Sequence, residues 1–265
     1  MSRLLEICIP FFGTPFPQTL KALGDSVPLI QNAGWTINTH LQHNNPYISN
    51  ARNAMLREAL DRYPDVVIFL DHDVSWDPVD LLRLVETPGD VVSGTYRFKK
   101  DEIEYMGAPM PDVHGQVQVR EVGTCHDPWN PEFDDAILGF SAPAGFLKIT
   151  PNAVSRFMKA YPQLMYGAAY APSVDLFNHG VHEGVWYGED YAFCRNWRDL
   201  GGELLLLPNL NISHWKREES GEYTEFKGNY HWYLASRAGG AMDPQRSDDN
   251  AEHETDRGGI RRSAA

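Results

Sequence analysis

Short apolar runs recur along the first hundred positions of this chain and alternate with stretches of helical periodicity. The run at 66–70 holds five consecutive apolar residues, a pattern typical of a strand buried on both faces of a parallel sheet. Similar patterns predict strands at 4–10, 35–41 and 90–98, and we expect Pro10 to stop the first of them.

Helices are predicted between these strands. Pro17 and Pro78 suit the first turn of a helix, so helices are expected over 17–34 and 78–86. The segment 49–63 carries an apolar stripe at helical spacing. Strand and helix therefore alternate over the first hundred residues, which predicts an α/β fold with a doubly wound, mainly parallel sheet, as in Rossmann-like proteins.

The second half of the chain is less regular. The segment 100–141 is expected to hold antiparallel strands and loops, with one clear strand at 116–122, and the segment 162–185 is expected to be loop-rich. The regular elements expected after residue 141 are strands at 145–150 and 203–207 and helices at 151–161 and 189–200. We expect a single domain over 1–238, followed by a polar, disordered tail at 239–265.

Asp71-His72-Asp73 follows the 66–70 strand directly. Open α/β sheets bind ligands where strands leave the sheet, and two carboxylates at this spacing can converge on one hard cation. Mg²⁺ and Mn²⁺ prefer such oxygen ligands and often share them with substrate phosphates. A polar turn after a strand is the alternative interpretation of the same three residues.

Composition and charge narrow the possible functions. The 265 residues carry a formal net charge of -13, which gives no support to a basic nucleic-acid-binding stripe. No apolar run approaches the roughly 18 residues of a membrane span, and the N-terminus is charged too soon for a signal peptide. Cys8, Cys125 and Cys194 are scattered and are expected to be buried thiols in a reducing compartment, so a cytoplasmic location is expected.

The order of several short motifs resembles that of GT-A glycosyltransferases, of the small soluble type found in phage and bacterial genomes. The resemblance covers roughly residues 4–216, and each motif is weak alone. The motifs are Ile9-Pro10-Phe11-Phe12, Ala51-Arg52-Asn53, Phe69-Leu70-Asp71-His72-Asp73, Val91-Val92-Ser93-Gly94-Thr95-Tyr96-Arg97-Phe98-Lys99, Pro143-Ala144-Gly145-Phe146-Leu147-Lys148-Ile149, Gly188-Glu189-Asp190-Tyr191-Ala192-Phe193-Cys194 and Ile212-Ser213-His214.

The resemblance implies a metal site and a nucleotide-sugar site. Asp71-His72-Asp73 matches the DxD motif, so Asp73 and Asp71 would hold Mn²⁺ or Mg²⁺, with His214 as a further ligand. Residues 1–100 would form the nucleotide-binding half, and 101–238 the acceptor-binding half. The residues implied in nucleotide-sugar binding are Pro10, Phe12, Thr14, Arg52, Asp71, His72, Lys99 and Gly145.

Gly188-Glu189-Asp190 matches the acidic motif at the start of the acceptor-side helix. The resemblance implies that Asp190 is the catalytic base of an inverting enzyme and that Glu189 holds the acceptor or a loop. A helix N-terminus is expected to lower the pKa of Asp190, which would make it a better anion than base. Both acids are also common as simple first-turn residues of helices.

Other residues leave alternatives open. His214 is also interpretable as a hydrogen-bonded histidine beside Trp215, and Lys99 as a surface charge after a strand. His179, His182 and Glu183 form a weak candidate zinc site, because their spacing is not HExxH and an acceptor-facing loop fits better. Aromatic residues crowd the irregular segments, where exposed rings would stack on sugars or bases: Trp129, Phe133, Tyr166, Tyr170, Phe177, Trp186 and Tyr187.

We therefore expect metal-dependent transfer of a sugar from a nucleotide donor, UDP being the commonest in this family. The acceptor is left open between a hydroxymethylated base in phage DNA and a hydroxyl group of a glycan or a protein. For a phage enzyme, the expected location is the host cytoplasm. The rival functions are a sugar-phosphate nucleotidyltransferase, a non-catalytic sugar-binding module and a nucleotide-sugar hydrolase. The segment 11–17 argues against the first rival, since it has one Gly and no Lys or Arg.

Overall fold

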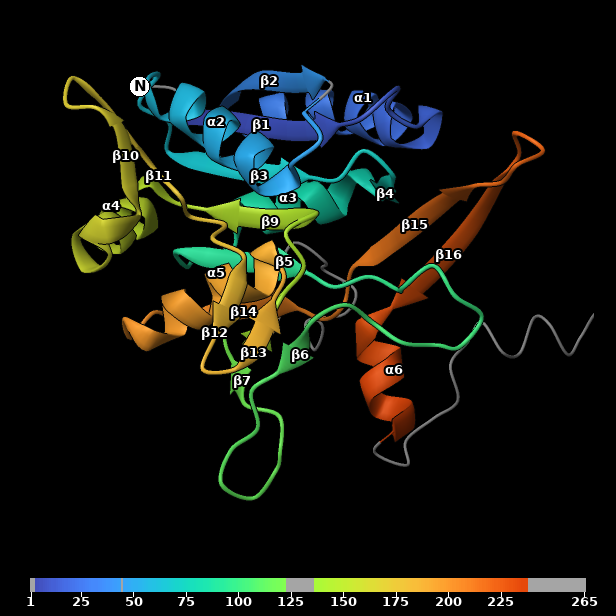
Figure 1. Ribbon diagram of the computed structural model, residues 1–265. Helices are drawn as coiled ribbons and strands as arrows, with labels where there is room; N and C mark the ends of the chain where they lie inside the picture. Colours follow the sequence, from blue (N-terminus) through green and yellow to red (C-terminus); the bar gives the residue numbers. More distant parts are fainter. Residues whose placement is uncertain (1–2, 44, 123–135, 238–265) are drawn as a thin grey trace, which may run out of the picture.

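A large mixed sheet forms the centre of the protein (Figure 1). The computed structural model describes residues 3–43, 45–122 and 136–237. The main sheet has the order β2 (Trp35–His43), β1 (Arg3–Phe11), β3 (Val66–Leu70), β9 (Phe146–Ile149), β5 (Val91–Gly94), β14 (Leu204–Leu207), β8 (Ala136–Ser141) and β6 (Ala108–Pro109), with β7 (Val119–Arg120) paired to β8.

Most of the central strands run in one direction. β2, β1 and β3 are parallel to one another, and β5 is parallel to β14. β9 lies between β3 and β5 and runs against both, and β8 runs against β14. The α/β class and the mainly parallel sheet that the sequence predicts are therefore confirmed.

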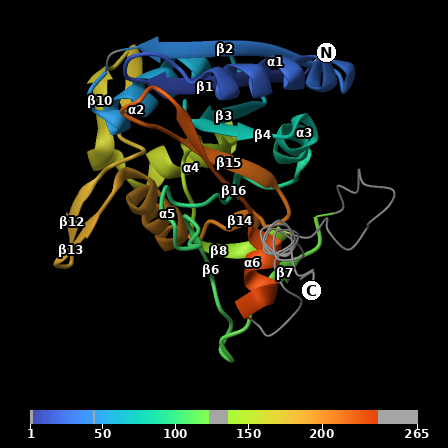
Figure 2. The ribbon, with the colours of Figure 1, turned by 90° about the vertical axis from the view of Figure 1, so that its right-hand side faces the viewer.

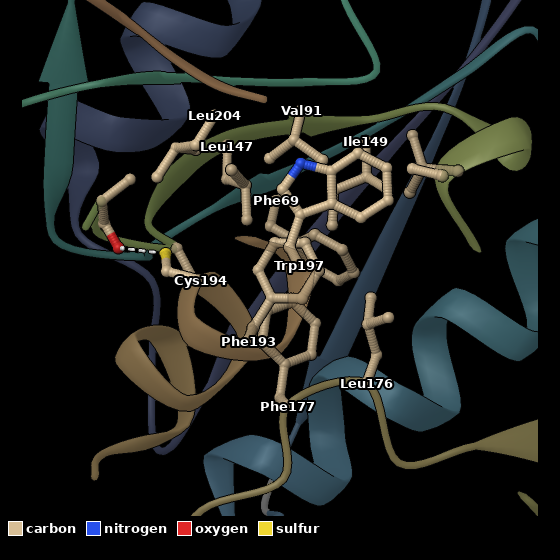
Figure 3. Close-up of a cluster of buried hydrophobic side chains, with 14 of the residues drawn as sticks. Phe69, Val91, Leu147, Ile149, Leu176, Phe177, Phe193, Cys194, Trp197 and Leu204 are labelled. Carbon is tan, nitrogen blue, oxygen red and sulfur yellow. Dashed lines mark hydrogen bonds between the residues drawn. The ribbon is translucent and has the colours of Figure 1, made fainter. Parts of the chain in front are cut away.

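Helices cover both faces of this sheet, as expected of a doubly wound fold. Apolar residues of α1 (Pro17–Asn32) and α3 (Pro78–Glu86) pack with one set of strand side chains, among them Ile7, Ile9 and Ile68. The opposite set packs against α2 (Ile48–Leu60), α4 (Pro151–Ala160) and α5 (Glu189–Asp199). Figure 3 shows this second core, in which Phe193 and Trp197 of α5 meet Phe69, Val91 and Leu147 of the strands.

A second, smaller sheet extends the fold beside the main one. β4 (Val74–Trp76) pairs with β15 (Asn211–Arg217), which pairs with β16 (Tyr223–Asn229), and α6 (Tyr230–Arg237) follows. The β15–β16 hairpin projects from the body of the protein in Figure 1, and Figure 2 shows it from the side. The sequence did not indicate β4 as a separate strand, because only four residues lie between Asp73 and Pro78.

Three sequence expectations need correction. Segment 162–185 is not simply loop: it contains the 3-10 helix η2 (Pro162–Leu164), the hairpin β10–β11 (Met165–Ala168 and Ala171–Val174) and most of the hairpin β12–β13 (Gly180–His182 and Val185–Tyr187). The strand expected at 116–122 is reduced to β7. β1 continues past Pro10, because β3 pairs only with Leu5–Cys8 and Pro10 therefore lies beyond that ladder.

The expected tail at 239–265, together with Cys125, Trp129 and Phe133, lies outside the described residues. Cys8 and Cys194 are buried free thiols, as the sequence predicts. Within the described part of the chain, no helix is both long and apolar enough to cross a membrane.

Candidate functional site

The antiparallel pairing of β3 with β9 brings Asp71 against Gly145. Leu70 pairs with Phe146, so the first residue after β3 meets the last residue before β9, and the Asp71 amide donates to the Gly145 carbonyl at 2.9 Å. A Cβ atom at Gly145 would lie 2.1 Å from the Tyr96 hydroxyl and 2.2 Å from Asp71 Oδ2. Only glycine allows this close approach, so the Tyr96 hydroxyl and the Asp71 carboxylate pack directly against the β9 backbone.

Arg52 links the strand-end acid to the helix-start acid. Its side chain comes from α2 and is almost fully buried, and its two terminal nitrogens donate to Asp71 Oδ1 and Glu189 Oε1, each at 2.6 Å. Burial opposes the charge of Arg52, but the two carboxylates outweigh it and raise the pKa of Arg52 above its ordinary value. The guanidinium fork thus joins residues 71 and 189 in one charged cluster.

Asp73 forms a second cluster with Lys99 and His214. β4 pairs with β15 so that Val74 faces His214, which brings His214 Nε2 to 3.5 Å from Asp73 Oδ1. The Lys99 ammonium pairs with Asp73 Oδ2. Burial raises the pKa of Asp73, but the hydrogen bond to His214 and the charge of Lys99 outweigh it and hold that pKa well below its usual range.

Asp190 stands in the first turn of α5, next to the Arg52–Glu189 pair. Its Oδ1 accepts from the Tyr191 amide at 2.8 Å, and no other described residue donates to its side chain. Burial, followed by the charge of Glu189, raises the pKa of Asp190 to about 6. The sequence prediction of a lowered pKa is therefore wrong, because desolvation and a neighbouring carboxylate outweigh the helix dipole.

A pocket of about 350 Å³ opens at the carboxyl ends of β1 and β2. Its walls are largely apolar, Phe12 is 67% exposed beside it, and His72 connects it to the strand-end acids. The residues around it are Pro10, Phe11, Phe12, Asn45, Pro46, Ile48 and His72. Three residues of the predicted nucleotide-sugar set thus share one pocket, whereas Thr14 lies exposed on the following loop and is not part of its wall.

Tyr96 is a site residue to which the sequence analysis gave no role. It follows β5, is fully buried, and its hydroxyl donates to Asp71 Oδ2 at 3.2 Å. Its ring meets the His214 ring edge-on at a centroid distance of 5.0 Å. Tyr96 therefore touches both clusters. Tyr96 belongs to the motif that runs from Val91 to Lys99, which was the only indication of a role in the sequence. A tyrosine after a strand cannot be distinguished from a core residue by sequence alone.

The residues around Asp73 suit a divalent cation only in part. His214 Nδ1 donates to the Arg97 carbonyl at 2.8 Å, and this bond orients Nε2 toward Asp73. Among the described residues, no group of three or more His, Cys, Asp or Glu side chains is arranged to hold a metal. One carboxylate and one imidazole therefore fit a cation whose remaining ligands come from substrate and water.

The residues of the candidate zinc site lie on the β12–β13 hairpin. His179 packs against Trp186 at 6.0 Å between ring centroids, while His182 faces Tyr187 at 6.3 Å. Val181 pairs with Trp186 across the hairpin. Because side chains alternate along a strand, His182 lies on the face opposite to Trp186. The aromatic residues divide: Phe177 is core, Tyr187 lies under the Arg195 guanidinium, and Trp186 and Tyr170 are exposed.

The sequence matches no protein-family model, and no curated protein shows significant similarity to it. Two similar solved structures are those of GalNAc-T7 with UDP, GalNAc and Mn²⁺ (12% identity, TM-score 0.44) and of S. aureus TarS 1-349 in complex with UDP-GlcNAc (11% identity, TM-score 0.38). The similarity covers 82% and 77% of this chain. It covers 44% and 55% of those chains, so this chain spans about half their length.

Proposed function

We propose that this protein is a glycosyltransferase that moves a sugar from a nucleotide donor to an acceptor hydroxyl. The observation that carries the proposal is the Arg52 bridge, which joins Asp71 at the end of β3 to Glu189 beside Asp190 at the start of α5. A donor-side acid and an acid beside the proposed base are thereby held by one guanidinium group. Such an arrangement suits a reaction that needs a leaving group and an attacking hydroxyl at one carbon atom.

The donor side has the parts that a nucleoside diphosphate requires. The pocket formed by Pro10, Phe12 and His72 offers apolar faces for a base, and the Asn45 side chain offers hydrogen bonds. Lys99, beside Asp73, supplies a cation for the diphosphate. Arg52 acts through Asp71, whose position it fixes.

A divalent cation, Mn²⁺ or Mg²⁺, would be held by Asp73 and His214, the diphosphate oxygens supplying further ligands. When bound, it would supply positive charge for the leaving diphosphate. Asp73 remains ionised over the physiological pH range, since its pKa is depressed. Asp71 is engaged with Arg52 and Tyr96, so we assign it to sugar or ribose contact rather than to the metal.

On the acceptor side, Asp190 is the residue free to take a proton. Glu189 is held by Arg52, whereas one oxygen of Asp190 makes no hydrogen bond to the described residues. In the proposed step the acceptor oxygen forms a bond to the anomeric carbon while its proton passes to Asp190. The bond from that carbon to the phosphate oxygen breaks, and its electron pair leaves with the nucleoside diphosphate. A base with a pKa of about 6 is ionised near neutral pH and still basic enough to assist.

The rival functions use fewer of these parts. A non-catalytic sugar-binding module has no need of a buried Arg52 bridging two carboxylates beside a third acid. A nucleotidyltransferase needs cations at its phosphate loop, and the loop between β1 and α1 contains none. A nucleotide-sugar hydrolase would use the same site with water as acceptor, so only an acceptor assay separates it.

The experiment is a thermal-shift screen of nucleotides and nucleotide sugars, with Mn²⁺ and with a chelator, followed by a transfer assay. We expect a shift with one nucleoside diphosphate that requires the metal, UDP being the first candidate. A ligand at a hundred times its Kd adds about 2.7 kcal/mol of stability, which such a screen detects. The absence of a shift with every nucleotide would contradict the proposal.

A further inference from the structure

A polar pocket of about 500 Å³ lies on the α2 side of the sheet and is distinct from the pocket beside Phe12 and His72. Its volume is in the usual range for small-molecule sites. One wall is the first half of α2, and the other two are η2 with the start of β10 and the loop after β11. The residues that line it are Ser49, Asn50, Asn53, Gln163, Leu164, Met165, Tyr166, Asp175 and Asn178.

This pocket adjoins the charged cluster of the candidate site. Asn53, in the pocket wall, follows Arg52 directly on α2. Phe177, on the loop that carries Asp175 and Asn178, packs its ring 5.6 Å from the Arg52 guanidinium. Two elements of the pocket wall, α2 and the loop after β11, therefore also carry Arg52 and the ring that packs on it.

A network of hydrogen bonds fixes the polar side chains of the pocket in place. Asn53 is almost fully buried, and its amide donates to Asp175 Oδ1 at 2.6 Å, while its oxygen accepts from the Phe177 amide at 3.3 Å. Asn178 donates to Asp175 Oδ2 at 2.7 Å. These bonds tie α2 to the loop after β11 before any ligand arrives, and preorganised polar groups of this kind lower the entropic cost of binding.

Other polar groups in the pocket remain available to a ligand. Ser49 is 7% exposed, and neither its hydroxyl nor the Gln163 amide makes a hydrogen bond to another described residue. Asn50 uses its oxygen to accept from Asn45 at 2.8 Å, which leaves its amide hydrogens available. The Ser49 hydroxyl is not one of the buried side-chain atoms that lack a partner, so it reaches solvent in the pocket, where a ligand hydroxyl would replace water.

The chemistry of the wall selects a neutral ligand rich in hydroxyl groups. Besides Tyr166, six of the nine lining residues are polar and none is Lys or Arg, while Asp175 adds a negative charge. A phosphodiester backbone would meet repulsion there, because its binding depends on cations. The Tyr166 ring, beside Leu164 and Met165, offers the apolar surface on which the C–H face of a sugar packs.

We infer that this pocket is a carbohydrate subsite that binds a neutral saccharide unit of the acceptor while a nearby hydroxyl of the same glycan lies at Asp190. The inference rests on the proposed function and makes it more specific: the acceptor is a neutral glycan and not modified DNA. The saccharide binds by hydrogen bonds to Ser49, Asn50 and Gln163 and by packing on Tyr166.

The test uses the full chain and an array of neutral glycans that also carries hydroxymethylcytosine DNA. Binding is compared for the wild type and for Tyr166→Ala and Gln163→Ala, two exposed positions at which truncation leaves the core intact. Tyr63→Ala is the matched control, since Tyr63 is an exposed tyrosine outside the pocket. We expect at least one neutral glycan to bind the wild type and the control equally, and each pocket variant about tenfold more weakly.

Donor binding, measured by the metal-dependent thermal shift, separates this inference from the proposed function. All four proteins should give the same shift with the nucleotide. If that shift is present but no neutral glycan binds the wild type, or the pocket variants bind it unchanged, the subsite is overturned and the proposed function stands. DNA binding that weakens in the pocket variants would likewise overturn it. Loss of the shift in the wild type would overturn the proposed function itself.

Discussion

His214 Nε2 lies 3.5 Å from Asp73 Oδ1, although 141 positions separate the two residues in the chain. The distance follows from the register of a three-residue strand, because β4 starts directly after Asp73 and pairs Val74 with His214. The Trp215 amide also donates to the Asp73 carbonyl at 2.7 Å, so the backbone is fixed on both sides of the pair. The backbone pairing of β4 with β15 therefore sets the position of the two side chains relative to each other.

The proximity of Asp73 and His214 leads to a prediction about the metal dependence of nucleotide binding. In Asp73→Asn and His214→Ala the protein should still bind nucleotide weakly, but the extra thermal shift that Mn²⁺ gives the wild type should be lost. Each change removes one of only two protein ligands that the site offers. The measurement is thermal unfolding with nucleoside diphosphate, with and without Mn²⁺. His179→Ala is the control, because its ring lies against Trp186 at the β12–β13 hairpin; a metal-dependent shift that survives in both site variants would refute the ligand assignment.

Asp190→Asn should separate binding from chemistry. The substitution keeps the size of the side chain and the bond accepted from the Tyr191 amide, but it removes the basic oxygen. We expect donor binding close to that of the wild type and a fall in turnover of about 10²–10⁴-fold, the usual contribution of a general base. Initial rates of sugar transfer, compared with the thermal shift given by the donor, measure both. Turnover within threefold of the wild type would exclude Asp190 as the base.

The pKa of Asp190 also predicts how stability and rate depend on pH. Its pKa is about 6 in the folded protein against 3.8 for an ordinary Asp, so between these pH values the folded state binds more protons than the unfolded state. Stability from this group therefore falls as pH rises through that window, and the cost is complete above pH 6. Asp190→Asn should be more stable than the wild type at pH 7.5, by roughly 1–3 kcal/mol, and equal to it below pH 4.

Urea unfolding at the two pH values measures that difference. Asp80, whose pKa burial raises to about 7, gives a trend in the same direction in both proteins, so the difference between them isolates Asp190. The kcat/KM of the wild type should also decline as pH falls through about 6, because the base becomes protonated. A rate that is flat between pH 5 and 7.5 would contradict the role of this carboxylate.

Gly145→Ala should disable the donor site with little change in the rest of the fold. The added methyl group would overlap the Tyr96 hydroxyl and the Asp71 carboxylate, both within 2.2 Å of its position. Either the carboxylate moves or β9 shifts, and we expect a loss of about 1–3 kcal/mol of stability together with a large loss of nucleotide affinity. Gly24→Ala is the control, since it sits in α1 with open space around the new Cβ atom. Equal donor affinity in the two variants would show that the approach at Gly145 is not needed.

The alternation of strands and helices was predictable because β1, β3 and β5 are short, largely buried apolar runs and the helices between the strands carry apolar stripes. The acidic residues at the end of β3 were predictable for the same reason: polar residues directly after a buried strand lie at the sheet edge. By contrast, the insertion of β9 against the direction of β3 and β5 was not predictable, since the sequence of a four-residue strand does not reveal its direction in the sheet. That insertion alone positions Gly145.

Interactions between distant residues account for the rest of what the sequence missed. The expectation that the dipole of α5 lowers the pKa of Asp190 was local, whereas the burial that raises it comes from the packing of α5 against the sheet. Tyr96 was interpretable only with Asp71 and His214 in place. In the polar pocket beside α2, Asn53 forms a hydrogen bond to Asp175, which lies 122 positions further along the chain. No local sequence pattern indicates such a pair.

Substitutions of Arg52 should affect both the stability of the fold and the rate of sugar transfer. Arg52→Met would leave Asp71 and Glu189 without their buried partner, and we expect a cost of about 3–5 kcal/mol. Arg52→Lys keeps the charge but cannot span both carboxylates, so it should lose less stability and still lose most of the turnover. Arg57→Met, on the same helix, breaks only the partly exposed pair with Asp61 and should cost less than about 1 kcal/mol. Urea unfolding and transfer rates measure the series; an Arg52→Met variant as stable as Arg57→Met would mean that the bridge holds neither the fold nor the site.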